Sequence, residues 1–189
     1  MMFALSERAQ DFIARTQAFI QQEIEPIEKA FWDEVHQLNV DGDWTKWQWP
    51  AQLEQLKTKA KAAGLWNMFL PDTELGAGLS VQEYAHIAEL TGRSLLAPTV
   101  FNCNAPDSGN MELLWRYGSR EQKQQWLQPL LNGDIRSVFC MTEPAVASSD
   151  ATNMQATAVI DGDEIVLNGR KWWSSGLGDP NAKVIIFMA

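Results

Sequence analysis

The sequence has few of the residues that build disulfide frameworks or metal centres. Its two cysteines, Cys103 and Cys140, lack CxxC spacing, and only two histidines are present. Paired or clustered Cys and His are the usual sign of a disulfide scaffold or a zinc site. Both cysteines are therefore expected to be reduced, buried thiols, and no metal site is predicted. His36 and His86 are isolated in helical segments, so neither is assigned a catalytic part.

Basic runs and long apolar runs are also missing. The formal net charge is −9 and Lys and Arg form no block, which argues against nucleic acid or an anionic membrane as the main partner. No segment approaches the roughly 20 apolar residues that span a bilayer. Acids near the N-terminus argue against a secretory signal or a transit peptide. These absences predict a soluble protein of a reducing compartment, most simply the cytoplasm.

The hydrophobic residues of the sequence are numerous enough to form an ordinary globular core. The chain has 189 residues, 46% of them hydrophobic and 21% charged, which fits one domain or one domain plus part of another. Nine tryptophans are an unusual number. They could belong to the core or line a pocket for a flat ligand, and the number alone does not choose.

Helical signals dominate the first two thirds of the sequence. Apolar residues keep helical spacing after Ser6, a helix cap, as far as Pro26, which should kink or end the helix. Residues 50–64 run from a proline to a glycine, the usual asymmetry of a helix. Capping boxes at "SVQE" (80–83) and "SREQ" (119–122) predict two further helices. Another helix is expected between Ser108 and Tyr117.

After Gly133 the hydrophobic period changes to that of strands. "IRSVFCMT", "MQATAVI", "EIVLNG" and "RKWWSS" predict strands, with tight turns at Asp161–Gly162 and Asn168–Gly169. The last segment, "NAKVIIFMA", is an apolar strand with no turn behind it, and roughly fifty residues are few for an independent β-domain. The predicted fold is therefore α+β. An all-helical domain (residues 1–135) precedes an incomplete antiparallel β-domain (136–189).

The stretch "FCMTEPAVASSDATN" (139–153) opens as a strand and continues in small residues, hydroxyls and acids. Its composition favours a polar surface loop. Small residues also allow a ligand to approach the backbone closely, and hydroxyls offer hydrogen bonds at short range. The residues by themselves leave both interpretations open.

Three motifs in order carry a family resemblance. The "FCMTEP…SSD" and "LNGRKWWSSG" motifs, behind a helical region, resemble the flavin-dependent acyl-CoA dehydrogenases. The usual family loop is T-E-P-G-x-G-S-D; here it is one residue longer, and Ala145, Ala147 and Ser148 replace its glycines. With "FNCNAPDSGNMELLWRYGS" upstream, the chain is similar to the subgroup linked to long-chain and 4-hydroxyacyl-CoA substrates.

The resemblance implies an FAD site in the β part. Phe139, Met141 and Thr142 would lie along the isoalloxazine ring, and Thr142 would hydrogen-bond it. Trp173 would stack against the flavin, and Ser175 matches a hydroxyl residue that hydrogen-bonds it. From periodicity alone, Trp173 would instead be sheet core.

The remaining site residues come from the same motifs. Ser148 and Ser149 match the Gly–Ser pair that approaches the cofactor and the CoA moiety, so Ser149 is also expected to bind substrate. Ser174, between two matched positions, joins the cofactor-binding set. Glu143 and Asp150 are given a structural role only.

The reaction implied by the resemblance is α,β-dehydrogenation of an acyl-CoA to the trans-2-enoyl-CoA in fatty-acid oxidation. An electron-transfer flavoprotein or similar acceptor and a homo-oligomeric protein are implied with it. The family's catalytic glutamate lies in a C-terminal helical domain, so no catalytic residue is assigned here and the chain alone is expected to be inactive. The alternatives are an acyl-CoA oxidase or flavin monooxygenase on the same scaffold, and a non-catalytic helical module that pairs through "VIIFMA".

Overall fold

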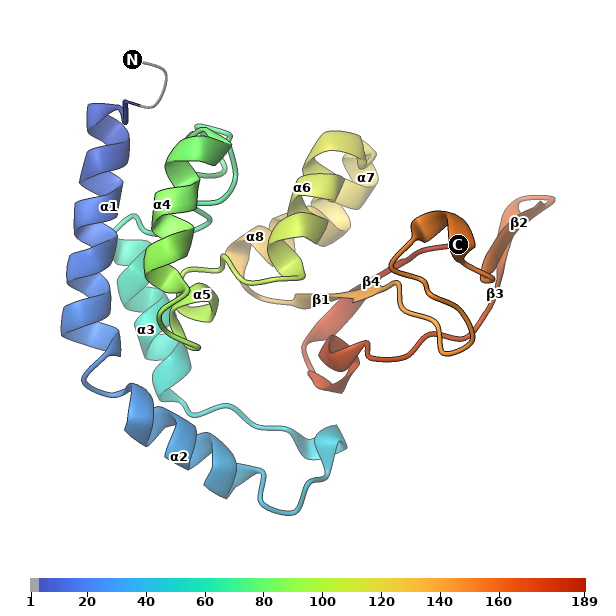
Figure 1. Cartoon of the computed structure of the whole chain (residues 1–189), viewed down its shortest axis with the longest axis horizontal. Coiled ribbons are helices and arrows are strands. Elements are labelled where there is room, and N and C mark those ends of the chain that lie inside the picture. Colours follow the sequence, from blue (N-terminus) through green and yellow to red (C-terminus); the bar gives the residue numbers. More distant parts are fainter. Residues whose placement is uncertain (1–3) are drawn as a thin grey trace.

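A computed structural model describes residues 4–189 and places a helical part before a small β part (Figure 1). The β part projects from one side of the helices in Figure 1. The α-helices are α1 (Glu7–Phe19), α2 (Glu28–Leu38), α3 (Gln52–Ala62), α4 (Val81–Thr91), α5 (Ala97–Val100), α6 (Asp107–Tyr117), α7 (Arg120–Gln122) and α8 (Gln128–Asn132). The strands are β1 (Arg136–Cys140), β2 (Thr157–Asp161), β3 (Glu164–Asn168) and β4 (Ala182–Phe187).

The helix boundaries follow local chemistry. Ser6 caps α1 by accepting the Ala9 N–H at 3.1 Å, and the helix continues through a π-helical turn (Ile20–Ile24) to end before Pro26, as predicted. Both capping boxes are confirmed, at the starts of α4 and α7. Gly133 ends α8 in the left-handed conformation (φ 76°), which a glycine adopts without steric cost.

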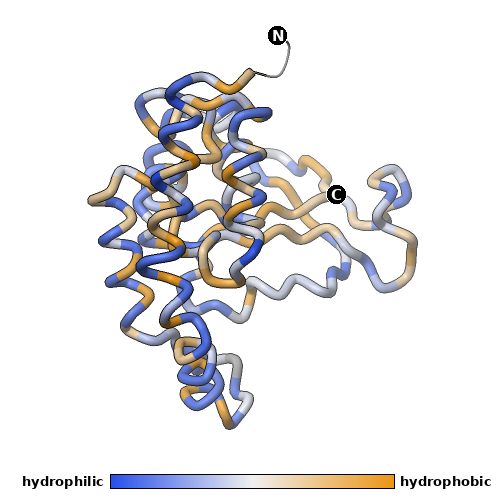
Figure 2. The backbone as a smooth tube through the Cα atoms, turned by 60° about the vertical axis from the view of Figure 1, so that its left-hand side comes forward, coloured by the Kyte–Doolittle hydropathy of each residue, from blue (hydrophilic) through white to orange (hydrophobic). Residues whose placement is uncertain are grey.

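Hydrophobic and hydrophilic residues alternate along the helices (Figure 2), and the apolar faces form two adjoining cores. The larger core surrounds Phe31 and Phe101, which are fully buried. The smaller core lies around Met111 between α6 and α8. Cys103 and Cys140 are buried free thiols, as predicted. Along residues 4–189, none of the helices combines the length and the apolar character that crossing a bilayer requires.

The α-then-β order is confirmed, whereas the prediction of a purely antiparallel sheet is wrong. β2 and β3 form the predicted antiparallel hairpin, with Asp161 opposite Glu164. β1 pairs with β4 in parallel, from Ser137 opposite Val184 to Cys140 opposite Phe187. This pairing joins residues 46 or 47 positions apart in the sequence, so no local signal specifies its direction.

The predicted strand at "RKWWSS" is also absent, and no hairpin forms at Asn168–Gly169. Trp173 has φ 58°, a left-handed conformation that a strand does not contain. The high β propensity of tryptophan is overridden here by tertiary contacts. The segment runs instead into a short 3-10 helix (Ser175–Gly178) that leads to β4.

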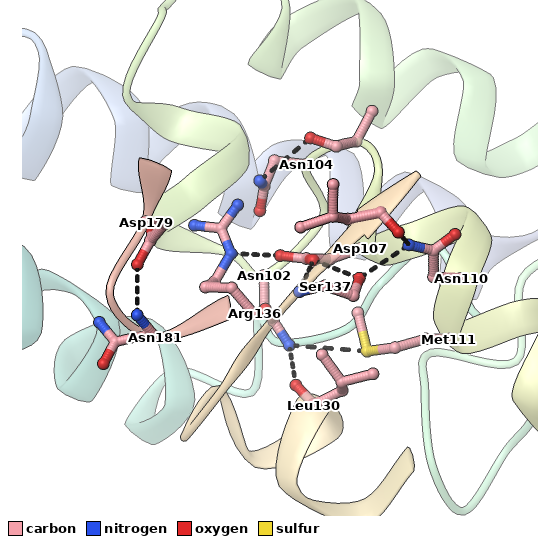
Figure 3. A network of polar contacts seen from close by, with 12 residues as sticks. Asn102, Asn104, Asp107, Asn110, Met111, Leu130, Arg136, Ser137, Asp179 and Asn181 are labelled. Carbon is pink, nitrogen blue, oxygen red and sulfur yellow. Dashed lines mark hydrogen bonds and ion pairs between the residues drawn. The ribbon is translucent and has the colours of Figure 1, made fainter. Parts of the chain in front are cut away.

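A buried carboxylate joins the helices to the sheet. Asp107, at the start of α6, accepts hydrogen bonds from the Ser137 N–H at 2.7 Å and the Ser137 Oγ at 2.6 Å, and it pairs with Arg136 Nε (Figure 3). Asn110, one turn further along α6, donates to Ser137 Oγ at 2.9 Å. The start of β1 is thereby fixed against α6, and this contact sets where the rest of the strand points.

Candidate flavin site

β1 presents two different faces. Val138 and Cys140 are buried, with exposed fractions of 1% and 3%, whereas Phe139 is 37% exposed. Met141 and Thr142 follow the strand, half-buried and exposed respectively. The alternation along a strand therefore puts Phe139 and Met141 on the face turned away from the core.

The small-residue loop after β1 uses one of its two serines internally. The Ser148 side chain is buried, and its Oγ accepts the Glu143 N–H at 2.7 Å. Ser149 is exposed. Asp150 Oδ1 accepts hydrogen bonds from the N–H and Oγ of Thr152, so Asp150 shapes the following turn (Ala151–Asn153). Of the predicted serine pair, only Ser149 presents its side chain outward.

Beneath this loop lies a buried ion pair. Lys171 Nζ donates to Glu143 Oε1 at 2.7 Å, and the two side chains are 6% and 3% exposed. The Glu143 carboxylate also accepts the Gln155 N–H at 2.7 Å and the Ala156 N–H at 3.0 Å. Lys171 was not among the predicted residues, and the sequence shows it only as the second of two adjacent cations, Arg170 and Lys171, before two tryptophans.

The hydrogen bond from Lys171, followed by that from the Gln155 N–H, holds the pKa of Glu143 at about 2. Because the folded-state pKa lies below the ordinary value of 4.5, Glu143 adds to stability above about pH 4.5, and that contribution is lost as the pH falls toward 2. The free energies of unfolding of the wild type and Glu143→Gln are expected to differ by a constant amount above pH 5 and to converge between pH 4.5 and 2.

Urea unfolding at a series of pH values measures this convergence. Glu83 provides a matched control, because hydrogen bonds from Ser6 and Ser80 also hold its pKa at about 2. Glu83→Gln should converge with the wild type over the same pH range, because the same direction of pKa shift acts there. A difference between the wild type and Glu143→Gln that is as large at pH 2 as above pH 5 would contradict the assignment.

The segment after Lys171 faces the end of β1. The Trp172 N–H donates to the Thr142 carbonyl at 3.0 Å. Trp173 is 77% exposed, so the expectation from periodicity that it belongs to the core is wrong. Ser174 Oγ is buried and has no hydrogen-bond partner within residues 4–189. Ser175 is exposed at the start of the 3-10 helix.

These residues fit an isoalloxazine ring. A flavin needs a flat apolar wall and hydrogen-bonding groups for its ring heteroatoms. Phe139 and Trp173 offer exposed aromatic surface, and Thr142 and Ser175 carry exposed hydroxyls. Ser174 adds a buried hydroxyl with unused hydrogen-bonding capacity.

A cavity of about 540 Å³ opens between the helices and the 3-10 helix, with Ser175 on its wall. Three tryptophans from α2 and the loop after it form one side, and the Trp47 and Trp49 rings lie 5.9 Å apart. Trp32 Nε1 is buried without a hydrogen-bond partner in the described part of the chain. The full lining is Trp32, Trp47, Trp49, Leu95, Thr99, Ala105, Pro106, Arg136, Ser175, Gly176, Gly178 and Asp179.

Fold and site together define a helical domain joined to a β module with an aromatic, hydroxyl-bearing face at the end of its first strand. Two family models match the chain in this order, the acyl-CoA dehydrogenase N-terminal domain over residues 6–134 and the acyl-CoA dehydrogenase middle domain over residues 138–189. The chain belongs to the acyl-CoA dehydrogenase family.

Individual relatives agree with this assignment. The chain is 51% identical over 187 residues to acyl-CoA dehydrogenase family member 11 of Rattus norvegicus. The matched region covers 99% of this chain and 23% of the relative. A solved structure from Mycobacterium abscessus, assigned to the acyl-CoA dehydrogenases, is 63% identical with a TM-score of 0.90, over 98% of this chain and 46% of that one. A glutaryl-CoA dehydrogenase from Mycobacterium smegmatis in complex with FADH2 is 27% identical, with a TM-score of 0.60, over 89% of this chain and 39% of that one. The chain thus spans less than half the length of each of these relatives.

Proposed function

We propose that the protein acts in the FAD-dependent α,β-dehydrogenation of an acyl-CoA thioester to the trans-2-enoyl-CoA. The observation that carries the proposal is the outward-turned pair Phe139 and Met141, followed by the exposed Thr142 and with Trp173 exposed nearby, in a chain of this family. The solved relative that binds FADH2 supports FAD as the cofactor. FAD, when bound, supplies the acceptor for the hydride that leaves the β-carbon.

The residues of this chain have binding and orienting roles in the proposal. Trp173 stacks on one face of the flavin, while Thr142 and Ser175 hydrogen-bond to its ring heteroatoms. Such fixed groups lower the energy of negative charge that develops during the reaction, because they need no reorganisation. Ser149, exposed on the loop, contacts the CoA part of the substrate. No residue of the chain is assigned as the base that removes the α-proton.

The cavity beside Ser175 suits an acyl chain, because its wall is mostly apolar and aromatic.

We propose further that residues 1–135 and 136–189 form separate domains and that an electron-transfer flavoprotein or similar acceptor reoxidises the flavin. We also propose that the protein is homo-oligomeric, lies in the cytoplasm and takes part in fatty-acid oxidation.

The proposal is tested by titrating the protein with FAD while following tryptophan fluorescence, with circular dichroism to show that the protein is folded. Saturable quenching is expected, and a folded protein that does not bind FAD would contradict the proposal. Residues 1–189 alone are expected not to form enoyl-CoA, since none of their carboxylates is assigned as the base. Oxygen consumption with acyl-CoA would instead favour an oxidase or a monooxygenase.

A further inference from the structure

We propose that Lys171 is a positioning residue that sets the separation between the two walls of the flavin site, residues 139–143 and 172–175. The inference rests on the proposed function and deepens it. Lys171 does not touch the face that would meet the flavin. It acts through the segments on which Phe139 and Trp173 stand.

The two walls are not held together by an ordinary strand ladder. β1 pairs with β4, and residues 170–174 form no strand. The backbone hydrogen bond between the walls runs from the Trp172 N–H to the Thr142 carbonyl. A ladder could not continue through Trp173, because its φ of 58° turns the backbone out of the extended conformation. Side-chain contacts therefore have to supplement this backbone hydrogen bond in holding the two walls together.

The Lys171 ammonium group makes side-chain contacts between the two walls. Nζ donates to the Met141 carbonyl at 3.0 Å and to Glu143 Oε1 at 2.7 Å, so it binds the end of β1 and the loop at once. It also lies 3.8 Å from Met154 Sδ and 5.1 Å from the centre of the Phe187 ring at the end of β4. One buried cation thus contacts three separate parts of the β module: residues 141–143, Met154 and Phe187.

Glu143 transmits this position to the small-residue loop. Its carboxylate accepts the Gln155 and Ala156 N–H groups, and its own N–H donates to Ser148 Oγ. A charge-assisted bond between two buried groups is stronger than a neutral one, and removing one partner leaves the other charge without compensation. A shift of Lys171 is therefore expected to move the loop and the Trp173 segment together.

The consequence concerns the flavin directly. A planar ring held between two walls loses contact when either wall moves by a fraction of an ångström, since dispersion and hydrogen bonding decline steeply with distance. Phe139 lies two residues before Met141, whose carbonyl Lys171 binds, and Trp173 lies two residues after Lys171, so both exposed aromatic side chains belong to segments that this contact joins. Fixing these supports is how a site gains affinity without adding contacts.

The test is Lys171→Met in the full-length protein, with Lys183→Met as the matched control. Lys183 lies in β4 of the same module, and within residues 4–189 the one hydrogen bond from its Nζ is to the nearby Pro180 carbonyl, at 3.0 Å. Lys171→Met is expected to weaken FAD binding by about tenfold and to speed amide hydrogen exchange at Trp172, Gln155 and Ala156 before FAD is added. Lys183→Met should change neither quantity. An affinity for FAD within twofold of the wild type would overturn the proposal, whatever the exchange rates.

Because Lys171→Met leaves Glu143 charged and buried, the double variant Lys171→Met/Glu143→Gln removes both charges and keeps the volume. It is expected to be folded by circular dichroism and still to bind FAD about tenfold more weakly. A double variant that is folded and binds FAD normally would show that the pair serves stability alone. If the wild type itself does not bind FAD, the proposed function fails first, and the amide exchange of the Lys171 variants still reports whether Lys171 joins the two walls.

Discussion

Asp107→Ala is expected to lower the free energy of unfolding by about 3–5 kcal/mol, the range observed when one partner of a buried ion pair is removed. The Asp107 side chain is 1% exposed and lies where the helical part meets the sheet. Its carboxylate accepts two hydrogen bonds from Ser137 and one from Arg136. Truncation would leave the Ser137 N–H buried without its partner and the Arg136 guanidinium without its counter-charge.

Urea unfolding measures this effect, and the slope with denaturant should stay the same because the surface exposed on unfolding is unchanged. Glu112→Gln is the matched control on the same helix. Glu112 pairs with Arg116 at the surface at 2.7 Å, where such pairs contribute about 0–1 kcal/mol. Equal and small losses in the two variants would contradict the view that Asp107 fixes β1 to α6.

Most of the helical part could be predicted because its signals are local. Ser80 with Glu83 and Ser119 with Gln122 form capping boxes three residues apart, and both boxes appear as the sequence predicts. The signal for the β2–β3 hairpin is local too, since an Asp–Gly turn joins its two strands. In these elements the sequence pattern and the final contacts involve the same neighbouring residues.

The β1–β4 pair and the Trp172–Trp173 segment could not be predicted in this way. Their geometry depends on contacts between distant residues, such as the one from the Trp172 N–H to the Thr142 carbonyl. "RKWWSS" has the composition of a strand, but the buried bond from Lys171 to Glu143 and the left-handed Trp173 impose another path. The family resemblance gave positions to the outward-facing residues. It gave Glu143 a structural role but did not point to Lys171, the buried partner of Glu143.

The candidate site shows the same division. The motifs named Thr142, Ser149 and Trp173, which carry exposed side chains. They also named Ser148, whose buried hydroxyl is used by the Glu143 N–H. A motif records which residue types recur at a position, and it does not distinguish a hydroxyl that meets a ligand from one that closes a loop. Only the direction of the side chain separates these roles.

Trp173→Ala is expected to weaken FAD binding roughly tenfold to a hundredfold, because stacking of a flat ring on an aromatic side chain is worth about 1–3 kcal/mol. The stability of the protein should change little. Trp173 is 77% exposed, so few contacts are lost when its side chain is removed. The left-handed backbone at residue 173 costs the wild type and the alanine variant a similar free energy, so the substitution does not change this strain.

The measurement is an FAD titration followed by flavin fluorescence, which does not depend on the tryptophan that is removed. Trp173→Phe keeps a flat apolar surface and should retain most of the affinity. Tyr117→Ala removes an aromatic side chain that is 80% exposed on α6, and it should bind FAD as the wild type does. If Trp173→Ala also bound FAD normally, the indole would not be a wall of the site, and the family assignment of this position would fail for this chain. A loss confined to Trp173→Ala would instead explain why the chain holds a tryptophan in a left-handed conformation at all: the strain turns the indole outward, toward the flavin.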